Sequence, residues 1–230
     1  MPVTTDVEQV VSDIIRWASI ESPTYDAAAV NRMMDEGARD LAAMGFDIER
    51  LPGTQGFGDV VIGRLAGTEP GPGLLILAHV DTVHAVGTLA GPLPIRREGD
   101  RLYGPGVTDM KGGTVLALHV LGKLISQKGG RLRRSVTVVL IPDEEVGSPS
   151  SRPAIEAEAA KAAHVLVPEP GRDHVVVSGR HAVVRYMIHV HGRPSHAGAA
   201  ISRGVSSIRA MARIIETIED WSDYERGQTF

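Results

Sequence analysis

The amino-acid sequence predicts an α/β fold in which helices cover both faces of a central sheet. Apolar runs of strand length alternate along the chain with longer segments whose apolar residues recur at helical spacing. One run, Leu-Leu-Ile-Leu-Ala at residues 74–78, is apolar at every position. A strand of this kind is buried on both faces, so we expect it near the centre of the sheet with helices above and below it.

The first helix is expected to begin after Thr4 or Thr5, because the apolar residues of 7–17 fall on one helical face. The Ser22-Pro23 pair is expected to end it, since proline restricts the backbone of the residue before it. Helices and strands then alternate. Further helices are expected at residues 26–44, 114–125 and 151–163, and strands at 46–50, 60–65, 74–78, 135–141 and 164–167.

The pattern changes after Pro170, which indicates a second domain. Two strand patterns, at 175–178 and 183–191, precede a polar loop and a helix expected from Gly204 to about Asp220. We therefore expect a larger domain over residues 1–179 and a smaller α+β domain over residues 180–230. A domain with so few helices and strands cannot cover its own sheet face. The chain is therefore expected to stop inside the smaller domain.

Composition narrows the class of protein. A hydrophobic content of 43% with 23% charged residues is typical of a soluble globular protein, and a net charge of -4 with scattered Lys and Arg argues against nucleic-acid binding. No apolar run is long enough to span a membrane, and residues 1–9 do not resemble a signal peptide. Because the chain has no Cys, a metal ion would need His, Asp and Glu ligands, and a cytoplasmic location is expected.

Two polar motifs point to metal binding. His79 and Asp81 follow the 74–78 strand, and residues two apart in a strand point the same way, so Asp81 can hold the second ring nitrogen of His79. Taken alone, a histidine at a strand end is more often a satisfied polar residue. The glycine-rich loop at 104–113 carries Asp109 ahead of a helix, without the spacing of dinucleotide or P-loop fingerprints, so Asp109 is either a helix cap or a ligand.

Carboxylates follow two further predicted strands. Asp143-Glu144-Glu145 comes after 135–141, and Glu169 lies between two prolines after 164–167. An isolated acidic turn is usually just solvated, but these motifs all fall at the carboxyl ends of successive predicted strands, where side chains converge. One imidazole with several carboxylates fits a hydrolytic two-metal site, whose ions lie roughly 3.5–4 Å apart.

These motifs, in this order, resemble those of M20 metallopeptidases, and the sequence Asp-Glu-Glu-Val-Gly-Ser-Pro-Ser-Ser-Arg at 143–152 looks most like the glutamate carboxypeptidase branch. The resemblance covers nearly the whole chain. It implies a zinc-peptidase-type sheet in the catalytic domain, an incomplete lid or dimerisation domain after it, and two Zn²⁺ ions per complete site, with Co²⁺ as a substitute. It also implies the site residues: His79 and Glu169 bind the first zinc, Asp109 bridges both ions, Glu145 binds the second, Asp81 orients His79, and Glu144 is the general base.

The sequence Gly-Arg-Pro-Ser-His-Ala-Gly at 192–198 extends the resemblance. From the residues alone His196 is a loop histidine. The resemblance implies that His196 belongs to the lid domain of a homodimer and stabilises the oxyanion in the partner subunit's active site. In the family, the histidine ligand of the second zinc and the residues that hold the substrate's carboxylate come from a later segment, so we expect a fragment or a truncated product.

The expected function is hydrolysis of an amide next to a carboxylate, in a small peptide or an N-acyl amino acid, as in a carboxypeptidase or dipeptidase. The alternative within enzymes is N-acyl amino acid deacylation of the acetylornithine or succinyl-diaminopimelate type, which uses the same metal motifs. The alternative from another class is a non-catalytic metal-binding or dimerising protein. The resemblance also predicts a cis peptide bond between Asp109 and Met110.

Overall fold

A computed structural model of the chain describes residues 6–171, 175–179 and 183–229. The chain divides into two units, Met1–Val176 and Val177–Phe230. The larger unit contains the sheet, and the described residues of the smaller unit include the α-helix α5 (Ser207–Glu219). The expected assignment of residues 1–179 to catalysis and of 180–230 to a lid is a statement about function and stays a prediction.

The larger unit is built on a five-stranded mixed sheet with the order β1-β2-β6-β3-β7. The strand β3 pairs in parallel with both β6 and β7, whereas β2 pairs antiparallel with β1 and with β6. The apolar run at 74–78 therefore lies inside the sheet, as predicted, and the carboxyl ends of β3, β6 and β7 share one edge. In chain order the strands are β1 (Asp47–Leu51), β2 (Val60–Leu65), β3 (Gly73–His79), β6 (Val136–Ile141) and β7 (Ala162–Leu166).

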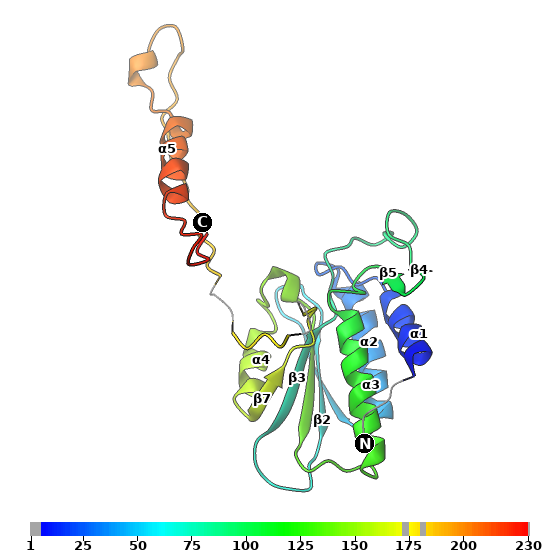
Figure 1. The fold of residues 1–230 in the computed structure, drawn as a ribbon. Coiled ribbons are helices and arrows are strands. Elements are labelled where there is room, and N and C mark those ends of the chain that lie inside the picture. Colours follow the sequence, from blue (N-terminus) through cyan, green and yellow to red (C-terminus); the bar gives the residue numbers. More distant parts are fainter. Residues whose placement is uncertain (1–5, 172–174, 180–182, 230) are drawn as a thin grey trace. The chain divides into compact units, whose positions relative to one another are not determined.

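Helices cover both faces of this sheet, which confirms the predicted fold class (Figure 1). Side chains of α1, α2 and α3 pack with Ile76 and Leu140 in one apolar cluster, and the short helix α4 packs with Leu75 and Val139 in a second. Because neighbouring residues of a strand point to opposite faces, these two clusters are the two sides of the same sheet. The helices are α1 (Val7–Ala18), α2 (Ala27–Ala43), α3 (Lys111–Gln127) and α4 (Arg152–Ala159).

Helix α1 ends earlier than the sequence suggests. Its N-cap is Asp6, whose side chain accepts the backbone N–H groups of the first turn, and its last residue is Ala18 and not a residue next to Ser22-Pro23. The segment after α1 leaves the helix because it binds the end of β3: Ser22 Oγ donates to the carbonyl of Val80 at 2.6 Å. The expected start after Thr4 or Thr5 falls partly on residues outside the described range.

A two-stranded hairpin that the sequence did not predict precedes the glycine-rich loop. It consists of β4 (Arg96–Glu98) and β5 (Arg101–Tyr103), which pair antiparallel apart from the main sheet. Each strand has only three residues and none of these residues is buried, so neither strand shows the apolar alternation by which strands are recognised. The hairpin leads the chain into the loop that carries Asp109.

The structure contains no strand at residues 175–178 or 183–191, so the two strands expected there do not form. A strand needs a neighbour for its backbone hydrogen bonds, and within residues 183–229 only isolated bridges occur, Arg193 with Val205 and Asp223 with Gln228. Helix α5 matches its prediction and is capped by Ser206. None of the described residues from 183 to 229 is buried.

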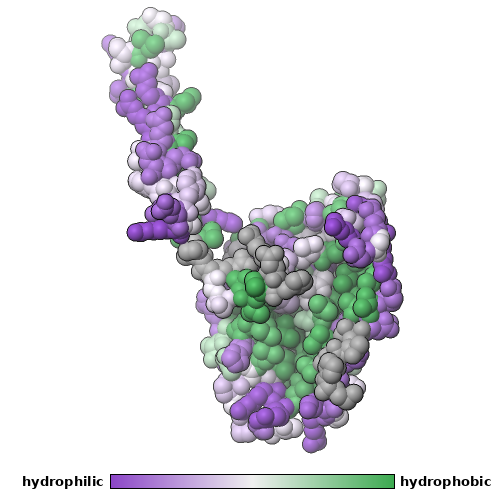
Figure 2. All heavy atoms as spheres, viewed as in Figure 1, coloured by the Kyte–Doolittle hydropathy of each residue, from purple (hydrophilic) through white to green (hydrophobic). Residues whose placement is uncertain are grey.

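The strand β7 is an edge strand, with β3 as its neighbour in the sheet. Figure 2 shows that apolar side chains gather on the face of the larger unit that is turned toward the viewer. Exposed apolar residues occur on α3 (Leu116, Val120, Leu124) and on or just after β7 (Val165, Leu166, Val167). Over the described ranges, every helix is too short or too polar to cross a lipid bilayer.

Candidate metal centre

The candidate site is centred on His79, the last residue of β3. Its side chain is buried, and Nε2 lies 2.9 Å from Oδ1 of Asp109 and 3.4 Å from Oε1 of Glu169. The other ring nitrogen, Nδ1, lies 3.0 Å from the backbone carbonyl oxygen of Asp81. If Nδ1 carries the proton of the neutral ring, Nε2 presents its lone pair to two carboxylates, an arrangement that a cation between them would stabilise.

The acidic residues reach this point from three different segments. Glu145 belongs to a 3₁₀ turn (Glu144–Val146) that follows β6, and Glu169 follows β7. Asp109 comes from the loop before α3, so it does not lie at the end of a sheet strand as expected. The ligand atoms of His79, Asp109 and Glu145 all lie within 4.8 Å of one another, so these three residues could hold one metal ion.

Asp81 connects these segments to one another. Its buried carboxylate accepts the backbone N–H groups of Glu144 at 3.2 Å and of Glu145 at 3.3 Å, and its Oδ1 lies 3.4 Å from His79 Nδ1. The hydroxyl of Thr24 donates to Oδ2 of the same carboxylate at 2.8 Å. Asp81 therefore fixes both the imidazole ring and the backbone of the acidic turn.

The electrostatics of the site favour a positive charge. Burial alone would lower the pKa of His79, but the carboxylates of Asp81 and Glu169 raise it to about 11. Burial and the negative charge of Asp109 raise the pKa of Glu145 to about 7. Burial and neighbouring carboxylates also raise the pKa of Glu144, despite the attraction of His79. A divalent cation fits this set of oxygen and nitrogen donors because it would neutralise carboxylates that otherwise repel one another.

The loop that carries Asp109 has the backbone conformation expected from the resemblance, because the Asp109-Met110 peptide bond is cis. The next residue, Lys111, is fully buried, and its Nζ donates to the carbonyl of Ile20 at 2.7 Å. Neither Lys111 nor Thr24 was predicted to take part in the site. Both sit in short polar motifs, and only their burial distinguishes them from ordinary surface residues.

His196 belongs to the smaller unit. Its Nδ1 accepts the backbone N–H groups of Gly198 and Ala199, both at 3.1 Å. An imidazole nitrogen that accepts hydrogen bonds carries no proton, so in the neutral ring the proton is on Nε2. His196 thus presents an N–H donor to its surroundings.

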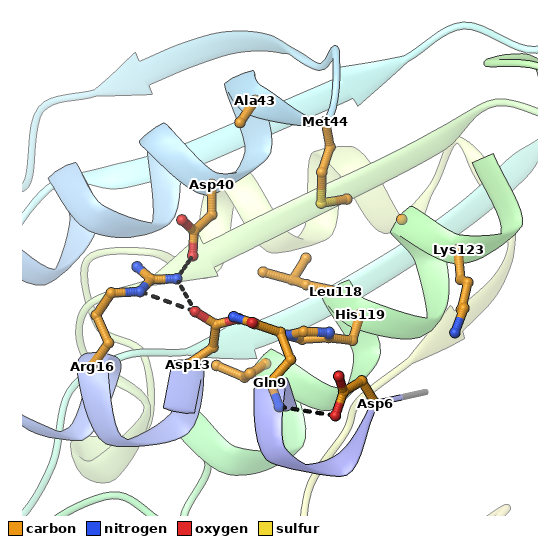
Figure 3. Close-up of a pocket in the computed structure, with 12 residues that line it drawn as sticks. Asp6, Gln9, Asp13, Arg16, Asp40, Ala43, Met44, Leu118, His119 and Lys123 are labelled. Carbon is orange, nitrogen blue, oxygen red and sulfur yellow. Dashed lines mark hydrogen bonds and ion pairs between the residues drawn. The ribbon is translucent and has the colours of Figure 1, made fainter. Parts of the chain in front are cut away.

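A pocket of about 420 Å³, separate from the candidate site, lies between α1, α2 and α3. The polar side chains that line it bind one another. Figure 3 shows Arg16 placed between Asp13 and Asp40, with ion-pair distances of 3.0 and 2.9 Å. His119 Nε2 lies 2.8 Å from Asp13, and Trp17 Nε1 donates to Asp40 at 2.7 Å. These contacts join the three helices, so we interpret the cluster as structural.

Comparisons with known proteins show what the chain is similar to. A family model described as peptidase family M20/M25/M40 matches residues 75–223. Carboxypeptidase G2 of Pseudomonas sp. (strain RS-16) is 35% identical over 209 residues, which are 89% of this chain and 49% of that protein. Acetylornithine deacetylase of Myxococcus xanthus is 28% identical over 81% of this chain and 48% of its own length. The chain thus spans about half the length of the curated relatives that it matches.

Among solved structures, a tripeptidase from Staphylococcus aureus shares the fold. Its TM-score is 0.67 at 18% sequence identity, over 94% of this chain and 58% of that chain. An identity this low shows the fold and leaves the choice of substrate open.

Proposed function

The chain belongs to peptidase family M20/M25/M40, and from this membership we propose that the protein hydrolyses an amide bond next to a carboxylate. The observation that carries the proposal is the convergence of His79, Asp109 and Glu145, whose ligand atoms lie within 4.8 Å of one another. A small peptide is the first choice of substrate because the relative with 35% identity is named a carboxypeptidase. An N-acyl amino acid is the second, because another relative is named acetylornithine deacetylase.

Two zinc ions are proposed as the metal cofactor, with Co²⁺ as a substitute. His79 and Glu169 would hold the first, Glu145 the second, and Asp109 both; this donor set of one nitrogen and several oxygens suits either metal. Zinc, when bound, supplies Lewis acidity that can lower the pKa of a water molecule to about 7. Asp81 would keep the ring of His79 oriented, in keeping with its 3.4 Å approach to Nδ1.

Glu144 is proposed as the general base. It would accept a proton from the attacking water and pass that proton to the nitrogen of the leaving amine. Its backbone N–H is held by Asp81 at 3.2 Å, next to the proposed ligand Glu145. Burial and nearby carboxylates raise its pKa, and a carboxylate with a raised pKa is a stronger base.

His196 is proposed to stabilise the oxyanion in the active site of a partner subunit, with residues 1–179 as the catalytic domain and 180–230 as the lid. The proposal requires a donor, and the two backbone N–H groups that bind Nδ1 leave the proton on Nε2. The protein would then act as a homodimer, because this histidine would serve a site other than its own.

The test is hydrolysis of a panel of dipeptides and N-acetyl amino acids by an active, full-length form of the protein loaded with zinc, measured as release of the free amino acid. We expect activity to be lost on chelation and to return with Zn²⁺ or Co²⁺. Preference for dipeptides would support the carboxypeptidase or dipeptidase assignment, and preference for N-acetyl substrates the deacylase assignment. Hydrolysis of no panel member by the full-length form with bound metal would favour a non-catalytic metal-binding or dimerising protein.

A further inference from the structure

The acidic turn that carries Glu144 and Glu145 is held by hydrogen bonds and not by packing. None of the three residues of this 3₁₀ turn (Glu144–Val146) is buried, so the apolar core does not fix its position. The roles proposed for Glu144 as base and Glu145 as ligand nevertheless require a fixed backbone, because a displacement of about 1 Å can lower a catalysed rate roughly 100-fold. Other groups must therefore hold the turn in place.

Asp143, the residue before this turn, is a fully buried carboxylate whose hydrogen-bond donors come from the far end of the turn. Its Oδ2 accepts the backbone N–H groups of Ser150 at 2.6 Å and of Ser151 at 3.2 Å, and its Oδ1 accepts the hydroxyl of Ser151 at 2.5 Å. The backbone carbonyl of Asp143 also accepts the N–H of Ser148 at 2.8 Å. Asp143 thus closes the segment 143–151 into a loop joined at its base.

The start of helix α4 is arranged around this carboxylate. Ser151 is the N-cap of α4, a position at which a serine hydroxyl ordinarily accepts a backbone N–H of the first turn. Here the side chain makes no such cap bond, and its hydroxyl donates to Asp143 instead. Because Ser150 and Ser151 also donate their backbone N–H groups to it, Asp143 ties the start of α4 to the end of β6.

Asp81 and Asp143 hold opposite ends of the acidic turn. Asp81 accepts the backbone N–H groups of Glu144 and Glu145 at its start, at 3.2 and 3.3 Å. At the other end, Ser148 has a φ of 57°, a left-handed conformation that is unfavourable for a residue with a side chain. Loss of the Asp143 side chain would release the residues after Ser148 and let it relax to an ordinary φ. Such a change would displace the turn together with its two carboxylates.

The loop between β1 and β2 also contacts the far end of the turn, but more weakly. Thr54 donates its backbone N–H to Oγ of Ser150 at 2.8 Å and its hydroxyl to the same atom at 3.0 Å, and Gln55 Nε2 donates to the carbonyl of Pro149 at 3.2 Å. These bonds are exposed, so water can replace either partner. The buried bonds to Asp143 have no such substitute and are the stronger constraint.

We propose that Asp143 is a positioning residue for the two acidic side chains that follow it. Its bonds to Ser150 and Ser151 set the place of the turn. The place of the turn sets the affinity for the ion that Glu145 binds and the rate of the proton transfer assigned to Glu144. The inference rests on the proposed function, which supplies these two roles, and goes beyond it because that function gives Asp143 no part.

The test measures Co²⁺ binding, by the visible absorption of the ion, and kcat for the best panel substrate, both in an active, full-length form of the protein. Asp143→Ala should raise the dissociation constant of the more weakly held Co²⁺ ion about 10–100-fold and lower kcat by a similar factor, as is usual when a group that orients a ligand is removed. The tightly held ion should keep its affinity, because His79 and Glu169 lie outside the turn. Asp143→Asn should restore both quantities to within a few-fold, because its amide can accept from Ser150 and donate to the hydroxyl of Ser151.

Glu158→Gln is the matched control for the loss of a buried carboxylate near α4. Glu158 is 6% exposed and pairs with Arg64 and Lys161 at the other end of this helix, so the variant should lose stability but keep Co²⁺ affinity and kcat. Ser151→Ala keeps the test independent of how well Asp143→Ala folds. It removes one donor to Asp143 and should weaken binding of the second Co²⁺ ion several-fold.

Three results would overturn the positioning role. The first is Co²⁺ binding and kcat that change no more in Asp143→Ala and Ser151→Ala than in Glu158→Gln. The second is an equal loss of affinity for both ions, and the third is an Asp143→Asn variant as impaired as Asp143→Ala. Weaker binding of the second ion in the Asp143 variants of a protein that hydrolyses no panel member in its wild-type form would overturn the proposed function. The effect of Asp143 on the ligand Glu145 would then still stand.

Discussion

Thr24 donates a hydrogen bond from Oγ1 to Oδ2 of Asp81 at 2.8 Å, across 57 residues of chain and with both side chains buried. The Asp81 carboxylate also holds the backbone of Glu144 and Glu145. The segment after α1 therefore orients the carboxylate on which the candidate site depends, although it contributes no proposed ligand.

Replacing Thr24 tests this relationship. In Thr24→Val the buried carboxylate loses one donor, so we expect the free energy of unfolding to fall by about 1–3 kcal/mol. We also expect weaker Co²⁺ binding, measured by titration of the visible absorption of the ion. Thr24→Ser keeps the hydroxyl and should restore Co²⁺ affinity. A valine variant that loses stability but binds Co²⁺ as tightly as the wild type would show that Thr24 is purely structural.

Gly113 allows Glu169 to approach the site. A Cβ at Gly113 would lie 1.9 Å from the carbonyl oxygen of Pro168, whereas at Gly122, on the same helix, the nearest atom would be 3.9 Å away. Gly113→Ala should displace the Pro168-Glu169 segment, lower stability by about 1–3 kcal/mol and weaken metal binding. Gly122→Ala is the matched control and should bind Co²⁺ normally. Equal Co²⁺ affinity in the two variants would show that the close packing of Gly113 against Pro168 does not affect metal binding.

Glu144→Gln separates proton transfer from metal binding. In an active, full-length form of the protein, the variant keeps the size of the side chain and removes the proposed base, so we expect metal content to stay constant and turnover to fall roughly 10²–10⁴-fold. The control is Glu156→Gln, an exposed position on α4. Activity within a few-fold of the wild type in Glu144→Gln would rule out Glu144 as the base.

The proposed ligands differ in number for the two ions. His79, Asp109 and Glu169 give the first ion three ligands, whereas Asp109 and Glu145 give the second only two. Three protein ligands are usual for a catalytic zinc, so the 230-residue chain, dialysed against trace zinc, should retain about one ion. Glu169→Ala should reduce the retained zinc and Glu145→Ala should not, as measured by elemental analysis. Loss of retained zinc in Glu145→Ala but not in Glu169→Ala would show that Glu145, and not Glu169, binds the retained ion.

The helix cluster of Figure 3 predicts a dependence of stability on pH. Burial raises the pKa of Asp13, but hydrogen bonds from Gln9, Arg16 and His119 outweigh it and hold the pKa below its ordinary value of 3.8. A carboxylate with a lowered folded-state pKa stabilises the fold above its ordinary pKa, and this stabilisation is lost as the pH falls through the folded-state value. Asp13→Asn should therefore flatten acid unfolding curves near and below pH 3.8, unlike the exposed control Asp47→Asn. Parallel curves for the two variants would contradict this.

The parts of the fold that could be predicted are those whose burial leaves a pattern in the sequence. The 74–78 strand was recognisable because both of its faces are covered, and α2 because one of its faces is. The β4–β5 hairpin was missed because its strands are short and have no buried residue. The strands at 175–178 and 183–191 were predicted wrongly because an apolar alternation does not supply a pairing partner.

The candidate site shows the same limit. His79, Glu145 and Glu169 could be grouped because parallel strands end at one edge of a sheet, but Asp109 arrives from a loop whose path no periodicity reveals. Thr24 and Lys111 escaped notice because their importance lies in burial, which single polar residues do not signal. The cis bond at Asp109-Met110 could be predicted from the resemblance and not from local sequence.

The proposed ligands at positions 79, 109, 145 and 169 belong to segments that only the finished tertiary structure brings together. An ion held by them would favour the folded chain over the unfolded one, by about 2.7 kcal/mol when its free concentration is a hundred times the dissociation constant. Resistance to heat would then report how much metal is available, with no substrate present. A cell short of zinc would carry a chain that opens more often and is degraded sooner, so the abundance of the protein would follow the supply of its metal.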